Sequence, residues 1–178
     1  MSAVLTTTAA IVGCGAGSDC DFGLCAGPAV GSDGGDGGGD GPPVIPGDCD
    51  LTKSPKDSKP CVDDAVAIFV DRNGKAGAAG TMKEPVPSID EAIAKAASTK
   101  RGRVYICDGK YDEPIKLSSA ISIYGGFDCS WANTGIKPKI VAPKSAGIEL
   151  RGVAEVVVIE DLDVTGSSDS NAKGSSAI

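Results

Sequence analysis

The second half of the chain is a succession of short β-rich runs that are interrupted by Gly, Pro, Asn and Ser. The runs are RVYIC, AISIYGG, PKIVAP, GIELRG and EVVVIEDLDVTG, with strands expected to begin near residues 104, 121, 139, 147 and 156. Short runs of this kind, rich in Val and Ile and bounded by turn residues, are typical of strands. The fold class is therefore predicted to be all-β, and a sandwich, a barrel or a solenoid would fit the pattern alone.

The spacing of these runs favours one of the three architectures. Successive strand starts lie about 17, 18, 8 and 9 residues apart. Steps of this size suit the several faces of a parallel β-helix, in which each coil stacks on the previous one. Upstream of the runs, AIFVD (67–71) predicts one more short strand.

One helical segment lies between that strand and the β-rich runs. Ser88 followed by Glu91 forms a capping box, which marks the start of a helix. After it, apolar residues recur at i, i+3, i+4 and i+7, which predicts one buried stripe made of Ile89, Ala92, Ile93 and Ala96. We expect a helix over 88–98 that ends before TKRGR.

A different composition governs the first third of the chain. The segment AVGSDGGDGGGDGPPVIPGD (29–48) is rich in Gly and Asp, then Pro, and has almost nothing to bury, so we expect it to be disordered. We assign residues 14–60 to a Cys-containing tether. Residues 15–60 hold eight Asp and three Lys, a net −5 of the chain's total of −7. This acidic balance argues against a nucleic-acid partner.

The chain opens with a stretch that is typical of export signals. Residues 3–13 form an apolar run that is too short to span a bilayer, which takes about 20 residues, but suits a secretory signal. IVGC (11–14) resembles the lipobox of bacterial lipoproteins, which implies a signal peptide over 1–13 and acylation of Cys14. Because Gly15 follows the cysteine, we expect the outer membrane or cell surface rather than the inner membrane. An ordinary secreted chain, with Cys14 in a disulfide, is the alternative.

The cysteine count also points to an oxidising compartment. Without Cys14, six cysteines remain, an even number that fits three disulfides: Cys20, Cys25, Cys49, Cys61, Cys107 and Cys129. The chain has no histidine and no CxxC, so the usual zinc spacings are missing and we expect no metal and no cofactor.

Two pairings of these cysteines follow from their positions. Cys49 and Cys61 lie at the two ends of a short segment, and a disulfide between them would close this segment into a loop at the entrance to the folded domain. Cys107 and Cys129 are 22 residues apart, within the range of one β-helix coil. Stacked strands lie about 4.8 Å apart, inside the Cα window of a disulfide. A bridge there would join the first coil to the second, although a hairpin or a bulged loop would also bring the two cysteines together.

Several short motifs between residues 66 and 166 match one known architecture. They are Gly80-Thr81, Pro85, Ser88-Ile89, Ala92-Ile93, Ala96, Val104-Tyr105-Ile106, the DGKY of Asp108–Tyr111 and the YGGF of Tyr124–Phe127. With these motifs the chain resembles the DUF1565-type domains of bacterial surface lipoproteins, in the pectin-lyase-like superfamily. The resemblance implies a right-handed parallel β-helix whose bare first coil is covered by the 88–98 helix, with Gly125-Gly126 at a corner.

The resemblance also sets an expectation for the length of the domain. The sequence provides about three coils, whereas β-helices usually continue much further. We therefore expect 61–178 to hold the N-terminal cap and first coils of a truncated β-helix. The alternative is an open edge that another subunit covers.

Many members of that superfamily act on acidic polysaccharides, so the resemblance also raises a catalytic role. Without histidine, the surviving routes are paired carboxylates or calcium with a basic residue. The best candidates are Asp161 and Asp163, which would share one face of a strand, with Arg151 as a partner. Their simpler interpretation is a solvated strand face. The loop carboxylates Asp112 and Glu113 are likewise expected only to solvate their loop.

The function predicted from the sequence is therefore non-catalytic. We expect a lipid-anchored surface or periplasmic protein with a binding or structural role, attached to the membrane through its N-terminal lipid, with a polysaccharide or a surface protein as its partner. The alternative is a polysaccharide lyase or glycoside hydrolase, or a fragment of one.

Overall fold

The computed structural model of the chain describes residues 44–142 and 144–167. Within these residues the fold is mainly β, as predicted, with one α-helix and one turn of 3-10 helix. The elements are η1 (Lys59–Cys61), β1 (Ala67–Val70), α1 (Ile89–Thr99), β2 (Arg103–Cys107), β3 (Lys110–Tyr111), β4 (Ile115–Leu117), β5 (Ser122–Phe127), β6 (Asn133–Ile136), β7 (Lys139–Ala142), β8 (Ile148–Leu150), β9 (Ile159–Glu160) and β10 (Asp163–Gly166). Strands β2, β5, β7 and β8 begin within one residue of the predicted starts, whereas β3, β4 and β6 were not expected.

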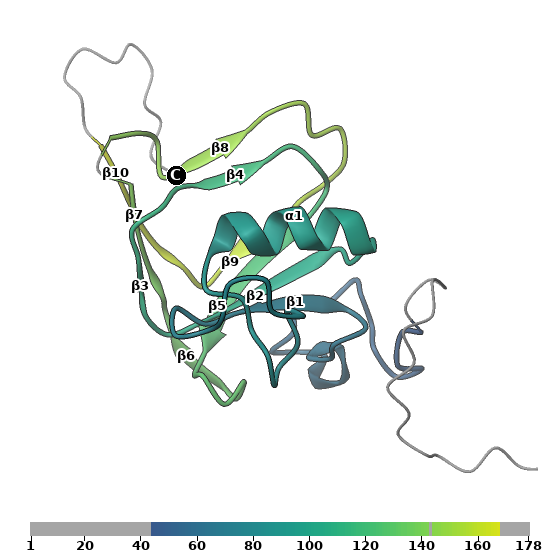
Figure 1. Cartoon of the computed structure of the whole chain (residues 1–178). Helices are drawn as coiled ribbons and strands as arrows, with labels where there is room; N and C mark the ends of the chain where they lie inside the picture. Colours follow the sequence, from purple (N-terminus) through teal and green to yellow (C-terminus); the bar gives the residue numbers. More distant parts are fainter. Residues whose placement is uncertain (1–43, 143, 168–178) are drawn as a thin grey trace, which may run out of the picture. The chain divides into compact units, whose positions relative to one another are not determined.

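The strands form three sheets whose pairs are parallel, except for the antiparallel pair of β5 and β6. Sheet A contains β1, β2, β5 and β9 in that order, and β6 also pairs with β5 in this sheet. Sheet B contains β3, β7 and β10, and sheet C contains β4 and β8. From β2 the chain passes through β3 and β4 and returns to sheet A at β5, and it then repeats this route through β7 and β8 to β9. Figure 1 shows the three sheets around a common interior.

The parallel register stacks similar residues in rows along each sheet. In sheet A, Ile68, Val104, Ile123 and Ile159 are successive partners. All but Ile159 are fully buried, and they belong to one aliphatic core that the three sheets share with the helix. β-Branched side chains pack well in such cross-strand rows, so the interior explains why these runs are rich in Val and Ile.

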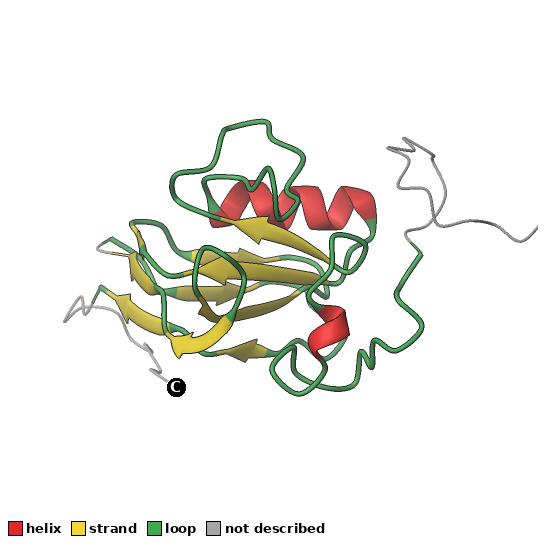
Figure 2. Cartoon of the chain, turned by 90° about the horizontal axis from the view of Figure 1, so that it is seen from below, coloured by secondary structure: helices red, strands yellow, loops and turns green. Residues whose placement is uncertain are grey.

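Helix α1 closes one end of this interior. It spans Ile89–Thr99, within one residue of the predicted helix, and its predicted apolar stripe is buried in the aliphatic core. Both views place the helix as a separate layer over the end of the strand stack (Figures 1 and 2). The Ser88 side chain accepts a hydrogen bond from the backbone N–H of Glu91 at 3.2 Å, as the capping box predicts.

In a capping box the glutamate side chain reaches back to the backbone N–H of the N-cap residue, but Glu91 does not do so. The carboxylate of Glu91 accepts a hydrogen bond from the Gly77 N–H at 2.8 Å, and thus holds the loop before the helix. Glu113, expected in a solvated loop, instead accepts from the backbone N–H groups of Ile89 at 2.9 Å and Asp90 at 3.2 Å. A carboxylate is favourable at a helix N-terminus, so the β3–β4 connection provides the cap that the local sequence does not complete.

The outer face of sheet A is buried as well, against aromatic side chains. Phe69, Tyr105, Tyr124 and Phe127 form a second cluster, and Trp131 packs on Phe69 with ring centroids 4.7 Å apart. Such edge-to-face contacts stabilise aromatic pairs beyond their buried area. A polar or charged outer face, as on a half-buried sheet, is therefore absent from this part of sheet A.

The N-terminal segment 44–66, which we call the strap, lies beside this outer face. Cys49 and Cys61 are joined by a disulfide with 4.7 Å between their Cα atoms, which confirms that predicted pairing. Ser58 and Cys61 are buried, and Tyr105 donates a hydrogen bond to the Cys61 carbonyl at 2.8 Å. Residues 44–60, assigned above to the tether, are thus part of the ordered structure because the disulfide and these contacts hold them to the sheet.

The second predicted disulfide joins neighbouring strands of sheet A. Cys107 ends β2 and Cys129 follows β5, and their Cα atoms are 5.0 Å apart. Because β2 and β5 are parallel partners, this bridge links two successive rounds of the chain, as the β-helix spacing predicted.

The run EVVVIEDLDVTG bends and does not form one strand. Ile159–Glu160 belongs to sheet A and Asp163–Gly166 to sheet B, and Asp161 lies at the corner with φ 57°. Gly125 lies beneath this corner, where an added Cβ would come within 2.8 Å of Leu162. The glycine pair was expected at a corner, but it lies inside β5 and accommodates the corner of the next round.

Candidate functional site

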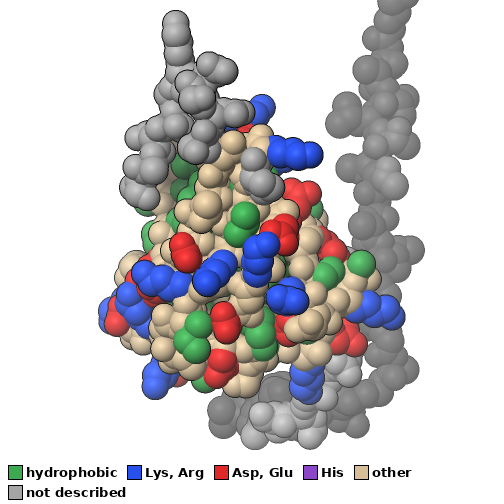
Figure 3. Space-filling model, turned by 90° about the vertical axis from the view of Figure 1, so that its left-hand side faces the viewer, with side chains coloured by type: hydrophobic (Ala, Val, Ile, Leu, Met, Phe, Trp, Pro, Cys, Tyr) green, Lys and Arg blue, Asp and Glu red, His purple; other side chains and the backbone are tan. Residues whose placement is uncertain are grey.

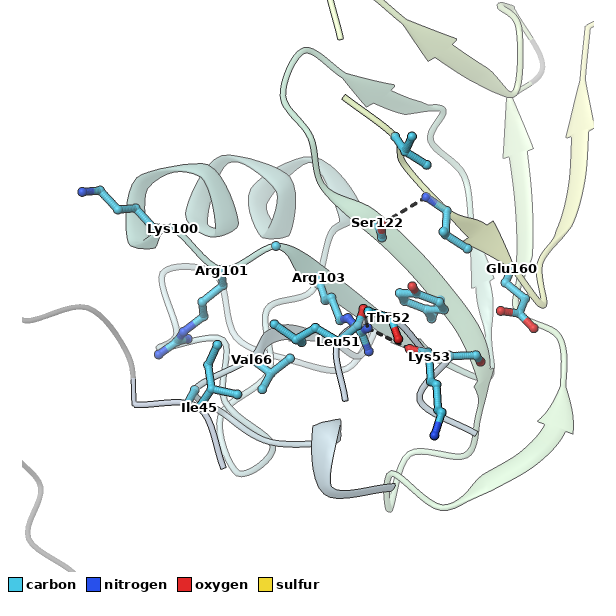
Figure 4. Close-up of a pocket in the computed structure, with 16 residues that line it drawn as sticks. Ile45, Leu51, Thr52, Lys53, Val66, Lys100, Arg101, Arg103, Ser122 and Glu160 are labelled. Carbon is cyan, nitrogen blue, oxygen red and sulfur yellow. Dashed lines mark hydrogen bonds between the residues drawn. The ribbon is translucent and has the colours of Figure 1, made fainter. Parts of the chain in front are cut away.

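A groove of about 540 Å³ opens between the strap and the outer face of sheet A (Figure 4). The beginnings of β2, β5 and β9 form its floor, and the residues after α1 form one side. Its lining is largely apolar side chains with four cations and one carboxylate: Ile45, Leu51, Val66, Val156 and Val158, then Lys53, Lys100, Arg101, Arg103 and Glu160. A chain of net charge −7 therefore carries a locally basic groove.

Arg103 occupies the centre of the groove but is committed to holding the strap. Only 5% of its surface is exposed. Its Nη2 donates to the carbonyl oxygens of Leu51 at 2.7 Å and Lys53 at 2.8 Å, and the guanidinium lies 5.2 Å from the Tyr124 ring centroid. A buried charge requires such partners, and here they fix the strap as one wall of the groove.

The phenol of Tyr105 is the third partner of Arg103, at 3.3 Å from Nη1. Burial raises the pKa of Tyr105 to about 12, and the nearby guanidinium opposes this shift only in part. The phenol therefore stays neutral near pH 7 and acts as a hydrogen-bonding group rather than as a base.

Two further cations of the groove, Lys100 and Arg101, are not engaged in ion pairs among the described residues. Lys100 ends α1 in the left-handed conformation, φ 57°, and points outward, while Arg101 extends toward Ile45 and Val66 (Figure 4). In the described part of the chain neither side chain forms an ion pair, and the Arg101 Nε is buried without a hydrogen-bond partner. An unpaired buried donor is costly, and because the Nε is enclosed by protein, only the remainder of the partly exposed Arg101 side chain can meet an anion.

The far side of the groove is closed by charges that already pair. Lys56 of the strap forms an ion pair with Glu160 and lies 3.9 Å from the Asp161 carboxylate. The hydrogen bond to Glu160 raises the pKa of the Lys56 ammonium. Lys53 similarly lies 3.3 Å from Asp50, so Arg101 and Lys100 provide the available positive charge.

The structure separates the three residues that the sequence offered as weak catalytic candidates. Asp161 lies at the β9–β10 corner beside Lys56, and Asp163 begins β10 on sheet B, where its register partner is Lys139. Arg151 follows β8 of sheet C and pairs with Glu149 at 3.0 Å. Within the described residues no hydrogen bond or ion pair joins Arg151 to either aspartate, and the two aspartates do not share a strand.

The remaining predicted residues divide between described and undescribed parts of the chain. Cys14, Cys20 and Cys25 lie outside the described residues. The Asp71 carboxylate lies within 4.8 Å of the sulfur atoms of Cys107 and Cys129. Because those sulfur atoms are bonded to each other, they are not the thiolates that metal binding requires.

No protein-family model, curated protein or solved structure matches this chain. The described residues contain no helix that is both long and apolar enough to cross a bilayer. The groove was not expected from the sequence, although one signal for it was present. TKRGR (99–103) places three cations within four residues directly after an amphipathic helix.

Proposed function

We propose that this chain is a lipid-anchored bacterial surface or periplasmic protein with a non-catalytic binding or structural role. Its folded part is proposed to be a right-handed parallel β-helix. The repeated passage through sheets A, B and C supports this architecture, and parallel crossovers are right-handed in nearly all known sheets. The helix over one end supports the resemblance to the lipoprotein domains described above.

The two disulfides are the observation that carries the proposed location. One closes the strap and the other joins two rounds of the chain, so both are built into the fold. Disulfides of this kind persist in oxidising compartments such as the periplasm and the cell surface. The acylated residue is proposed to be Cys14, which leaves the remaining six cysteines to form three disulfides.

The arrangement of the charged groups supports a binding role rather than catalysis. The buried Arg103 holds backbone carbonyls, and Glu160 pairs with Lys56. The groove thus offers a basic and apolar surface, and the two carboxylates at its edge, Glu160 and Asp161, are both engaged by Lys56.

Intact-mass analysis of the full chain made in a bacterial host tests this proposal. The expected product is extracted from membranes, begins at Cys14, carries acyl chains and lacks the hydrogens of three disulfides. A Cys14→Ser variant is the matched control and loses the acyl mass while retaining the disulfides. A soluble wild-type product whose Cys14 is unmodified would overturn the anchor.

A further inference from the structure

Exposed apolar side chains concentrate around the groove. Seven large apolar residues are exposed in the described part of the chain, and four of them line it: Ile45, Leu51, Val156 and Val158. Val44 precedes Ile45 and is 87% exposed, and Val156 is 91% exposed. Exposed apolar patches of this kind mark interaction surfaces.

A different side of the same body lacks this combination. The side formed by β3, β7 and β10 carries interspersed basic and acidic side chains (Figure 3). Lys110 pairs with Asp112 there at 2.7 Å, and Lys139 lies beside Asp163 in the ladder. No large apolar residue of these three strands is exposed. The basic and apolar groove is therefore a local feature.

We propose that the groove is a docking face for an anionic lipid surface. Arg101 and Lys100 receive headgroup phosphates, and Val44 and Val156 at the rim contact the acyl boundary of the bilayer. Cations beside exposed apolar side chains are what interfacial binding to anionic membranes requires. The inference rests on the proposed membrane anchorage, which would keep the protein at a lipid surface.

Two observations favour lipid over other anionic partners. The groove has only two cations without an ion pair among the described residues, too few to account for a polyanion site. If only a free anion bound, the four apolar residues would stay exposed to water. Arg101 is partly exposed and forms no ion pair among the described residues, so its guanidinium is available to a headgroup phosphate.

Vesicle co-sedimentation tests the proposal with the full chain carrying Cys14→Ser, purified in its disulfide-bonded form. Binding is expected to vesicles of equal parts phosphatidylglycerol and phosphatidylcholine, and not to phosphatidylcholine alone. Arg101→Gln is expected to lower the partition coefficient about fivefold, and Val156→Asp more than tenfold. Lys139→Gln and Leu150→Asp, which change exposed residues outside the groove, are matched controls that leave binding unchanged.

The variants share residues 1–13, so a difference between them reports on the groove and not on the apolar leader. Equal binding by wild type, Arg101→Gln and Val156→Asp, with unchanged circular dichroism, would overturn the proposal. Displacement of the protein from vesicles by inorganic phosphate, but not by sodium chloride at the same ionic strength, would instead assign a free-anion site. Binding of polyglutamate in preference to vesicles would assign an acidic peptide, and both results would overturn lipid docking. Failure here with Cys14 acylated in the mass experiment would refute the docking face and leave the anchor intact.

Discussion

The two faces of sheet A are both buried, but they are closed by different means. The inner face carries aliphatic rows such as Ile68, Val104 and Ile123, and the following rounds of chain and α1 cover it. The outer face carries aromatic residues such as Phe69 and Tyr105, and the strap and two loops cover it. The inner face closes through the repeat of the chain's own route, whereas the outer face is covered by the strap, which one disulfide and the buried Arg103 hold in place, and by two loops.

Truncating one residue on each face is the most severe test of this comparison. Phe69→Ala is expected to lower the free energy of unfolding by about 4 kcal/mol, and Ile68→Ala by about 3 kcal/mol, because each leaves a cavity in a fully buried cluster. Urea unfolding followed by circular dichroism measures both. A cost below about 1 kcal/mol for Phe69→Ala alone would mean that the outer face is not a true core.

Removing the disulfide of the strap should weaken the covering of the outer face of sheet A and leave that of the inner face intact. The double variant Cys49→Ser with Cys61→Ser is expected to lose about 3 kcal/mol, since the bridge restricts the unfolded chain. Limited proteolysis should then cut preferentially between residues 50 and 58, with the inner core protected. Cys107→Ser with Cys129→Ser is the control, with a similar or slightly larger loss. Unaltered proteolysis of the strap would contradict the role assigned to its bridge.

Alkaline pH should weaken both faces, because one buried tyrosine lies in each cluster. Burial raises the pKa of Tyr105 to about 12 and also raises the pKa of Tyr111. A tyrosine whose pKa is higher in the folded than in the unfolded protein stabilises the fold fully below the unfolded-state pKa of about 10. This stabilisation is lost as the pH rises toward the folded-state pKa of about 12. Each phenol adds a slope of about 1.4 kcal/mol per pH unit in that window.

Urea unfolding at a series of pH values between 9 and about 12 measures this dependence. Tyr105→Phe and Tyr111→Phe should each remove their own share of the slope. A slope that is unchanged in Tyr105→Phe would show that its phenol already ionises freely, and hence that the strap does not seal the outer face.

The smallest expected effects concern the helix that closes the inner face. Ser88→Ala and Glu113→Ala should each cost about 1 kcal/mol, because each removes an acceptor for the first N–H groups of α1. Asp112 lies on the same loop and, among the described residues, pairs with exposed Lys110 alone, so Asp112→Ala should cost less than about 0.5 kcal/mol. Thermal unfolding of the three variants distinguishes them, and equal effects would contradict the cap.

The elements that could be predicted from sequence are those with local signals. Ser88 and Glu91 marked the helix start to within one residue, and the spacing of Cys107 and Cys129 indicated their bridge. The strands of β3 and β4 are two and three residues long, too short for a periodic pattern, and were not expected. Asp161 and Asp163 were assigned to one strand because nothing in the local pattern indicates the corner between them.

The groove depended on contacts that join segments far apart in the chain. Arg103 binds the carbonyls of Leu51 and Lys53, about 50 residues upstream, and Val158 reaches Ser122 across 36 residues. Only the cationic run TKRGR was visible beforehand, without an indication of what would face it.

By itself, then, the sequence determined the mainly β character and the position of α1, and it indicated the two disulfides. Each follows from residue spacing along a short stretch of chain. The tertiary structure alone decided that the strap packs on the aromatic outer face of sheet A and that a basic, apolar groove lies between the strap and this sheet. It also decided that Glu113 caps the helix. The physical reason is that backbone carbonyls and carboxylates accept hydrogen bonds from any donor within reach, so their partners are set by how the chain closes on itself and not by local order.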